Sequence, residues 1–337
     1  MKKCTGTGLI ALDVLIKGKS DTNPKIFVGG SCGNVLCILS FLNFQSFPIA
    51  RLGDNDATDL IIEDLERWGV NSDFIEREDK GSTPIIIHRI LESPENEPKH
   101  RFEFKNPSNG KWLPSFRPVL AKNVESITKR LPKTDVFYFD RVSRSSIELA
   151  KDAKRQGSLV FFEPSSNRET KQFEECLKIC DIVKFSDERI KSYKQDYQYI
   201  QTILEIETSG KNGLNFRYQS DEWVNLDSFS IDRAVDTAGA GDWCSAGIID
   251  YLISNTNSSI ENLESEEIFN ALRYGQALGS LNCLFDGARG LMYQIDKSQF
   301  DISIDLVLRR QPIDSVLNNN EDYEGSILEL QAILASS

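Results

Sequence analysis

The sequence predicts an α/β protein: a three-layer sandwich in which helices cover a mostly parallel central sheet. Two observations indicate this fold. Short apolar runs of strand length alternate along the chain with longer segments whose apolar residues recur at helical spacing. One stretch rich in β-branched residues interrupts the alternation, and it predicts a small β lid that stands off the main sheet.

The first part of the chain supplies strands and helices in turn. Residues 9–16 form a mostly apolar run and are expected to be the first, buried strand. A short strand over 25–28 leads into a helix over 31–44. A second core strand over 47–52 and a helix over 59–68 repeat the pattern, which is typical of a parallel sheet covered by helices.

The lid is predicted from the next segment. Residues 83–91 are dense in β-branched side chains, residues 100–104 alternate in polarity, and the polar segment 92–98 separates them. This arrangement is typical of an antiparallel hairpin. We expect lid elements near residues 14–30 and 80–106. An exposed strand edge on the lid can pair with a second subunit, which favours a homodimer through the lid.

The alternation resumes after the lid, and the last third of the chain is mainly helical. Strands are expected over 136–139, 159–162, 182–185, 204–207 and 214–218, and helices over 145–156, 170–180, 240–253 and 265–285.

Composition narrows the range of partners. The formal net charge is -12 and no basic run is present, so a nucleic-acid backbone would be repelled. No stretch approaches the ~18 consecutive apolar residues of a membrane helix, and no signal-peptide pattern follows the first residues. The seven cysteines are scattered and contain no CxxC pair, so neither disulfides nor structural zinc is expected. We therefore expect a cytoplasmic protein that binds small molecules, without nucleic acid or membrane.

A glycine-rich segment before a helix predicts a phosphate site. Residues 236–242 read Asp-Thr-Ala-Gly-Ala-Gly-Asp and precede a clear helical run. Their small side chains leave backbone N–H groups uncovered where the helix dipole also favours an anion. A carboxylate there, Asp242, is better suited to accept a proton from an attacking hydroxyl than to meet a resting phosphate. The alternative is a glycine-rich turn with Asp242 as an ordinary acid of the first helical turn.

A second cluster predicts the site of the acceptor molecule. Gly29 and Gly30 let the backbone approach a ligand closely, and Asn34 offers a donor and an acceptor to hydroxyls. Asp13 is expected near the end of the first strand, where ligands collect in open α/β sheets. Arg101 on the lid can reach a polar substrate. Alternatively, Asn34 and Asp13 bond their own backbone and Arg101 lies in solvent.

These segments resemble the two signatures of the ribokinase-like (PfkB) carbohydrate kinase family. Residues 236–242 are similar to the second signature, Asp-Thr-x-Gly-Ala-Gly-Asp before a helix. Residues 29–34, a helix and the Arg-Leu-Gly-Asp run at 51–54 are similar to the first. The resemblance covers residues 4–300 and implies a ribokinase-like domain over 1–300. It leaves 301–337 as a C-terminal extension without an assigned role.

The resemblance implies an ATP-dependent kinase that phosphorylates a hydroxyl of a sugar-like small molecule. Asp242 matches the catalytic base, and the matching anion hole is the backbone of Gly239, Ala240 and Gly241. The matching substrate-binding residues are Asp13, Gly29, Gly30 and Asn34, to which we add the lid residue Arg101. The matching nucleotide-binding residues are Thr208, Gly210, Gly213 and Asn282.

The resemblance also implies Mg²⁺, which neutralises charge on the transferring phosphoryl group. Many members organise it through water with an Asn-x-x-Glu motif, but Ser186 and Arg189 stand at those two positions here. Asp187 or Glu188 can serve instead. Members that are activated by a monovalent cation such as K⁺ use the residue that matches Asp236.

A further departure is Glu163, which precedes Pro164 where many sugar kinases of the family have Asp-Pro. Two other functions remain open. A nucleoside kinase of the same fold would need apolar surface to stack a base, which Phe27 and residues 85–87 can supply. A catalytically silent ligand sensor would explain Ser186 and Arg189, but it would not need a base at position 242.

Overall fold

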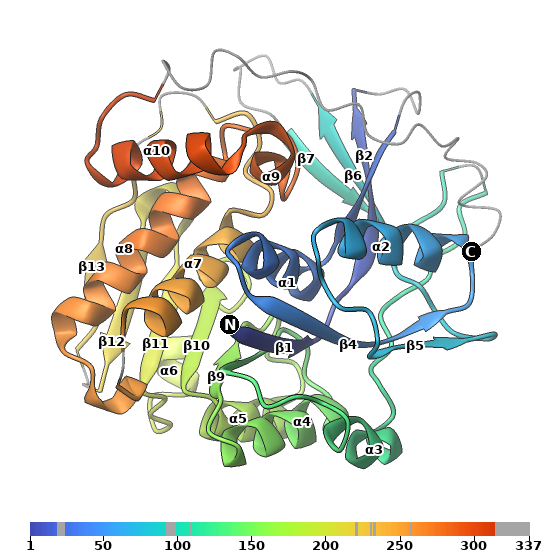
Figure 1. Cartoon of the computed structure of the whole chain (residues 1–337), viewed down its shortest axis with the longest axis horizontal. Coiled ribbons are helices and arrows are strands. Elements are labelled where there is room, and N and C mark those ends of the chain that lie inside the picture. Colours follow the sequence, from blue (N-terminus) through green and yellow to red (C-terminus); the bar gives the residue numbers. More distant parts are fainter. Residues whose placement is uncertain are drawn as a thin grey trace.

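The computed structural model describes residues 1–313 except 19–23, 92–98, 108, 220–221, 230, 232–233 and 257. In this part of the chain, helices cover both faces of a nine-stranded sheet, and a four-stranded sheet stands beside it. Figure 1 shows the helices above and below the large sheet. The predicted three-layer α/β architecture is therefore confirmed. The polar turn at 92–98 and the extension beyond residue 313 lie outside the described residues.

The large sheet has the strand order β13-β12-β11-β10-β9-β8-β1-β4-β5. From β11 to β5 every neighbouring pair is parallel, and β12 and β13 add an antiparallel edge. The central strands are buried on both faces and are therefore continuously apolar, as in β8. The strands are β1 (Lys3–Thr7), β4 (Gln45–Gly53), β5 (Ile75–Glu78), β8 (Val136–Phe139), β9 (Leu159–Phe162), β10 (Ile182–Ser186), β11 (Leu204–Thr208), β12 (Leu214–Tyr218) and β13 (Val224–Leu226).

Two apolar cores lie on opposite faces of this sheet. One core is formed with α1 (Ser31–Phe41), α2 (Asp56–Arg67), α7 (Ala240–Asn255), α8 (Ser265–Asn282), α9 (Gly290–Gln294) and α10 (Lys297–Leu308). The other is formed with α3 (Val124–Thr128), α4 (Arg144–Arg155), α5 (Thr170–Ile179) and α6 (Tyr193–Asp196). Both sides of the parallel strands are thus shielded from water, which leaves the carboxyl ends of the strands as the place for a site.

The second sheet has the order β3-β2-β6-β7 and lies where the lid was predicted. Its strands are β2 (Ala11–Lys17), β3 (Lys25–Gly29), β6 (Ile85–Leu91) and β7 (Lys99–Glu103). One face packs on α2, where Leu12, Val14 and Val28 join the apolar core. The opposite face carries Asp13 and is turned toward the segment before α9.

The strand predicted over residues 9–16 is present as β2, but it belongs to the second sheet and is not the first strand of the large sheet. That first strand is β1, which was not predicted, and Gly8 lies between β1 and β2. The sequence Lys-Cys-Thr-Gly-Thr of β1 carries no apolar run, but it pairs with β4 and β8 on its two sides. Asp13 therefore lies within the second sheet and not at the end of a strand of the large sheet.

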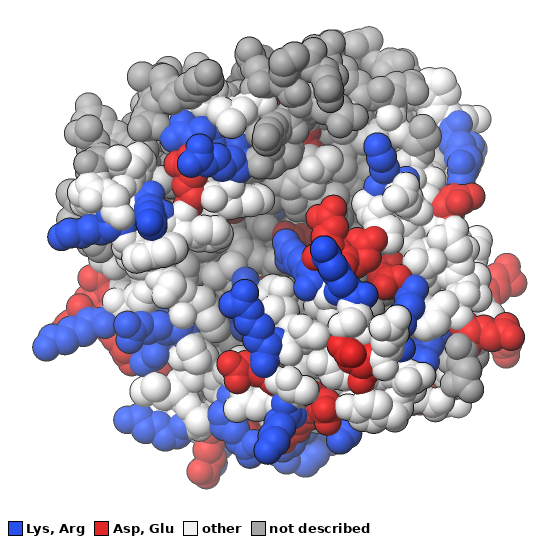
Figure 2. Space-filling model, turned by 180° about the vertical axis from the view of Figure 1, so that it is seen from behind, with Lys and Arg blue, Asp and Glu red and all other residues white. Residues whose placement is uncertain are grey.

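The end of the described chain packs on the domain. The predicted boundary after residue 300 falls inside α10, whose Phe300 ring contacts Phe41 and Trp243. The seven cysteines are free and buried. On the face drawn in Figure 2, the described basic side chains are interspersed with acidic ones and do not gather into one broad area. Within the described residues, every helix is too short or too polar to cross a membrane.

Candidate active site

The predicted anion hole lies at the N-terminus of α7. Gly239 precedes the helix with a φ of 75°, and a Cβ on it would lie 2.0 Å from the carbonyl oxygen of Ala288. Only glycine fits this left-handed, crowded position. Among the described residues, no acceptor pairs with the N–H groups of Gly241 and Asp242. The predicted phosphate-binding loop, residues 239–241, and the residue after it therefore present free backbone donors at the positive end of a helix, while the Ala240 N–H donates to the Thr237 carbonyl oxygen at 3.4 Å.

Two buried side chains fix this loop. The Asp236 carboxylate accepts the N–H groups of Ala238 and Gly287 at 2.8 and 2.9 Å. The Asn282 amide donates to the carbonyl oxygens of Ala238 and Gly287 at 3.0 and 3.4 Å, and its oxygen accepts the N–H of Leu291. Both side chains are 0% exposed. Asn282, predicted to bind the nucleotide, is placed where it braces the loop from inside.

Asp242 stands in the first turn of α7, beside the loop. The Asn34 amide of α1 donates to Asp242 Oδ2 at 2.7 Å, which joins two signatures that lie far apart in the sequence. Burial, followed by the charge of Glu163, raises the pKa of Asp242 to about 7, although the Asn34 hydrogen bond and Lys184 oppose the shift. A carboxylate with a raised pKa is a stronger base than an ordinary aspartate, and with a pKa of about 7 a substantial fraction of it is ionised at neutral pH.

The predicted acceptor residues converge on the same place. A Cβ on Gly29 would lie 1.9 Å from the Asp13 carboxyl carbon, so glycine makes room for that carboxyl group. Gly30 has a φ of 77°, and a Cβ there would lie 2.4 Å from the Leu9 carbonyl oxygen. One carboxyl oxygen of Asp13 and the amide oxygen of Asn34 are buried without a hydrogen-bond partner. Such oxygens call for donors, and hydroxyl groups of a ligand would supply them.

The carboxyl group of Asp13, in the predicted acceptor site, also interacts electrostatically with Asp242. Burial raises the pKa of Asp13 to about 7; Arg289 opposes this and the charge of Asp242 adds to it. A pocket beside Asp13 is lined by aromatic and polar side chains from the second sheet and from the segment before and within α9. They include Phe27, His88, Arg289 and Tyr293. The Phe27 and Tyr293 rings meet edge to face at 5.4 Å.

Arg101 is not brought to this pocket. The strand register pairs Asp13 with Ile86 and Arg101 with Arg89. Because residues 86 and 89 point to opposite faces of β6, Asp13 and Arg101 also lie on opposite faces. The Arg101 side chain is 66% exposed and pairs with Glu103 at 3.4 Å.

The predicted nucleotide residues occupy the turn between β11 and β12. Thr208 ends β11 and donates to the carbonyl oxygen of Phe185 at 3.3 Å. Gly213 has a φ of 88°, and a Cβ there would lie 2.1 Å from the Leu226 carbonyl oxygen. Glycine at this position therefore allows the end of β13 to pack against the turn. Gly210 has a φ of 54° with no atom near its missing side chain, which leaves its backbone open to a ligand.

The candidate metal residues follow β10 at the same edge of the sheet. The N–H of Asp187 donates to the Thr208 carbonyl oxygen at 3.1 Å, and Glu188 and Arg189 are exposed. In the described residues, no group of three or more His, Cys, Asp and Glu side chains is placed to hold a metal. A Mg²⁺ ion at this edge would thus need phosphate oxygens and water among its ligands, which is usual for Mg²⁺ that accompanies a nucleotide.

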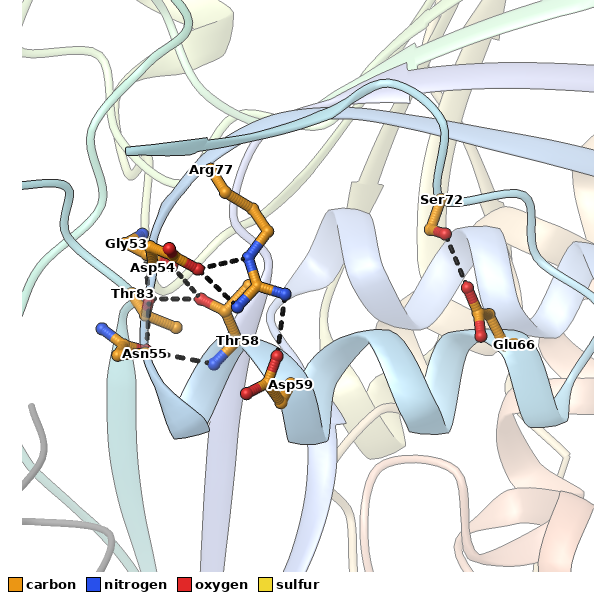
Figure 3. Close-up of polar contacts among 9 residues, drawn as sticks. All are labelled: Gly53, Asp54, Asn55, Thr58, Asp59, Glu66, Ser72, Arg77 and Thr83. Atoms are coloured by element: carbon orange, nitrogen blue, oxygen red, sulfur yellow. Dashed lines mark hydrogen bonds and ion pairs between the residues drawn. The ribbon is translucent and has the colours of Figure 1, made fainter. Parts of the chain in front are cut away.

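The Arg-Leu-Gly-Asp run serves the turn between β4 and α2. The hydroxyl oxygen of Thr83 accepts the N–H of Gly53 at 3.0 Å, and Thr58 donates to the Gly53 carbonyl oxygen at 2.6 Å. Figure 3 shows these contacts together with Arg77, which pairs with Asp54 and Asp59. The Asp54 carboxylate is therefore paired with Arg77 and contributes to the structure of this turn.

Sequence reasoning missed a buried ion pair under the phosphate-binding loop. Lys184 of β10 donates to the carboxylate of Glu163, which follows β9. Tyr138 and Ser245 donate to the other carboxylate oxygen. A lysine inside the apolar run of β10 was the available indication, because a lysine there must be paired when both faces of the strand are covered.

Comparison with known proteins agrees with this geometry. A family model described as "pfkB family carbohydrate kinase" matches residues 17–293. The ATP-dependent ribose-1-phosphate kinase of Halopiger xanaduensis is 25% identical over 267 residues, which cover 77% of this chain and 82% of that protein.

Two solved structures share the fold. The fructokinase of Vibrio cholerae O395, bound to fructose, ADP and calcium ion, aligns with a TM-score of 0.65 at 18% identity, covering 86% of this chain and 96% of its own. The aminoimidazole riboside kinase of Salmonella enterica, complexed with aminoimidazole riboside and an ATP analogue, aligns with a TM-score of 0.66 at 17% identity, covering 90% and 100%. Since the family model spans most of the sequence, the chain belongs to the pfkB family of carbohydrate kinases.

Proposed function

We propose that the protein transfers the γ-phosphoryl group of ATP to a hydroxyl of a sugar-like small molecule, with Asp242 as the general base. The observation that carries this proposal is the position of Asp242. It lies beside the free N–H groups at the start of α7 and bonds Asn34, on the acceptor side, at 2.7 Å. One carboxylate thus borders both the phosphate and the acceptor regions.

The acceptor is held by side-chain oxygens that have no hydrogen-bond partner among the described residues. These oxygens of Asp13 and Asn34 accept hydrogen bonds from the hydroxyl groups of the acceptor. Gly29 and Gly30 have no side chains, so the acceptor can lie against their backbone. Arg101 is left out of the proposed acceptor site, because it lies on the far face of the second sheet.

The transfer is a direct displacement. The acceptor oxygen attacks the γ-phosphorus, the bond from that phosphorus to the bridging oxygen of ADP breaks, and ADP leaves with the bonding electrons. The hydroxyl proton passes to the Asp242 carboxylate. The N–H groups at the start of α7, above all the free ones of Gly241 and Asp242, donate to the phosphoryl oxygens, where charge must be stabilised in the transition state.

The nucleotide is proposed to lie along the turn at Thr208, Gly210 and Gly213, with its phosphates toward the start of α7. Mg²⁺ would neutralise phosphate charge there, and Asp187 and Glu188 are the residues that would hold it through water. We also propose K⁺ beside Asp236, whose buried carboxylate places a negative charge at the phosphate-binding loop. Equal rates in buffers of K⁺ and of a bulky organic cation would exclude the K⁺ proposal.

The second sheet is proposed to act as a lid that closes over the acceptor and excludes water, and its edge is the proposed contact of a homodimer. A cytoplasmic location is proposed from the seven free cysteines, which a reducing compartment preserves. Cross-linking of the purified protein and sedimentation analysis test the dimer.

A nucleoside acceptor is the second candidate, and the aromatic pocket favours it. Phe27, His88 and Tyr293 line the pocket beside Asp13, where a base could stack while the ribose hydroxyls meet the carboxylate. A structural relative is itself a riboside kinase. A silent ligand sensor is less favoured, because the base and the donors of the anion hole are all present.

The test is ADP formation from MgATP with hexoses, pentoses, keto-deoxy sugar acids and nucleosides, with Asp242→Asn in parallel. A substrate-dependent signal that this variant loses supports the proposal and identifies the acceptor class. Binding of sugars or nucleosides without any ADP formation would contradict it and favour the sensor.

A further inference from the structure

A hydrogen-bonded ion pair lies beneath the phosphate-binding loop. Lys184 is 1% exposed, and its ammonium group donates to Oε1 of Glu163. The other carboxylate oxygen accepts hydrogen bonds from Tyr138 of β8 at 3.0 Å and from Ser245 of α7 at 2.5 Å. Burial alone would lower the pKa of Lys184, but the acidic groups around it, Glu163 first among them, together raise it. Lys184 is therefore a cation at neutral pH.

The pair lies directly against the backbone of the loop. A Cβ on Gly241 would lie 3.7 Å from the Lys184 nitrogen and 3.8 Å from Glu163 Oε1. Because the side chain of Gly241 is only a hydrogen atom, the two charged groups lie next to the backbone at this position. Asp242 is the next residue, and Ser245 ties Glu163 to the first turns of the same helix. The helix that carries Asp242 is therefore tied to the ion pair through Ser245.

The charged groups that face Asp242 come from several elements. Glu163, after β9, repels its negative charge, while Lys184 in β10 and Arg189 after β10 attract it. Asp13 in β2 faces it from the acceptor side. Lys184 and Glu163 differ from the other groups because a hydrogen bond fixes them to each other. Their opposite effects on the pKa of Asp242 therefore always act together.

We propose that Lys184 and Glu163 are positioning residues that control how tightly Asp242 holds a proton: Glu163 fixes the ammonium group under the loop, and the balance of the two charges leaves Asp242 ionised when the acceptor hydroxyl arrives. This inference rests on the proposed role of Asp242 as the base. Neither residue needs to touch a substrate, because both act through the carboxylate above them.

Removing one charge at a time should move the pH profile in opposite directions. Glu163→Gln keeps the shape and an acceptor oxygen but leaves the ammonium group unbalanced. The acid limb of the pH profile, where kcat at saturating MgATP falls as the pH is lowered, should then move to lower pH by about 1 unit. Lys184→Met leaves the carboxylate unbalanced, and the limb should move to higher pH by a similar amount. The double variant should return close to the wild type.

This sign reversal separates electrostatic control from damage to the fold, which would lower activity at every pH. Each single variant leaves one buried charge without its partner and can fail to fold, whereas the double variant leaves none, so either single variant that folds is sufficient for the test together with the double variant. Lys154→Met is the matched control. Lys154 pairs with Asp181, which precedes β10 at the other end of the strand, and its loss should leave the acid limb in place.

The outcomes distinguish the inference from the proposed function. Suppose the acid limb is unchanged in a folded, active Glu163→Gln enzyme while Asp242→Asn is inactive. The inference is then overturned and the proposed function stands. If Asp242→Asn turns over like the wild type, the proposed function itself fails. A shift to lower pH in Glu163→Gln that the double variant reverses supports the inference.

Discussion

Asp64→Asn is expected to destabilise the protein strongly, because it breaks a buried clamp behind the acceptor site. Asp64 of α2 accepts hydrogen bonds from Arg289 at 2.6 Å, from the N–H of Val28 at 2.9 Å and from Tyr293 at 2.8 Å. The Arg289 side chain is 1% exposed; its Nη2 bonds Asp64 and the Val28 carbonyl oxygen, and its Nε and Nη1 have no hydrogen-bond partner in the described part of the chain. Removal of one member of a buried pair leaves an uncompensated charge, which costs about 3–5 kcal/mol.

The sign of the pH dependence follows from the same contacts. Burial alone would raise the pKa of Asp64, but Arg289 and the Val28 N–H hold it below its ordinary value. The clamp therefore stabilises the fold fully above the pKa of an unfolded aspartate, about 3.9, and the contribution is lost as the pH falls through the lower, folded value.

An exposed ion pair of another aspartate in the same helix, with Arg77 of β5, provides the control. Asp59 bonds Arg77 at 2.7 Å, but the two side chains are 60% and 36% exposed. Asp59→Asn should therefore cost no more than about 1 kcal/mol. Urea unfolding at neutral pH, followed by circular dichroism, measures both variants. An Asp64→Asn enzyme that loses no more stability than Asp59→Asn would refute the reasoning.

Three further predictions concern activity. Gly239→Ala should lower kcat by about 100-fold or more, because the new Cβ would meet the Ala288 carbonyl oxygen and displace the N–H donors; steady-state kinetics with retained folding check it. Asn34→Ala should lower kcat/KM for the acceptor by about 10- to 100-fold and move the acid limb to higher pH, because it removes a hydrogen bond that lowers the pKa of Asp242; an unmoved limb would contradict this. In the wild type, kcat should fall as the pH drops below about 7, where Asp242 becomes protonated; a flat profile from pH 5 to 8 would exclude a base with that pKa.

The fold was predictable wherever local sequence decides structure. Residues 159–162 and 214–218 are apolar or alternating runs between turn residues, and both are strands with the expected bounds. Residues 3–7 carry no such pattern. They form a central strand only because β4 and β8 offer ladders on both sides, and that information lies in other parts of the chain.

The site divides in the same way. The glycines at 239 and 30 are recognisable because each occupies a backbone conformation or a crowded position that the local motif requires. The direction of a side chain is not local. Asn282 turns inward to the loop and Arg101 turns to the far face of its sheet, and both orientations depend on strand and segment pairing. The pairing of Lys184 with Glu163 likewise arises only when β9 and β10 lie side by side.

The most direct test of the account is Asp242→Asn, measured at once for turnover and for nucleotide binding. With an acceptor identified by the substrate panel, the account predicts that ADP formation falls by about 100- to 10,000-fold. Nucleotide binding, followed by calorimetry, should persist, because the backbone donors of the loop are unchanged. Turnover within about tenfold of the wild type would contradict the central claim that Asp242 takes the proton of the acceptor hydroxyl.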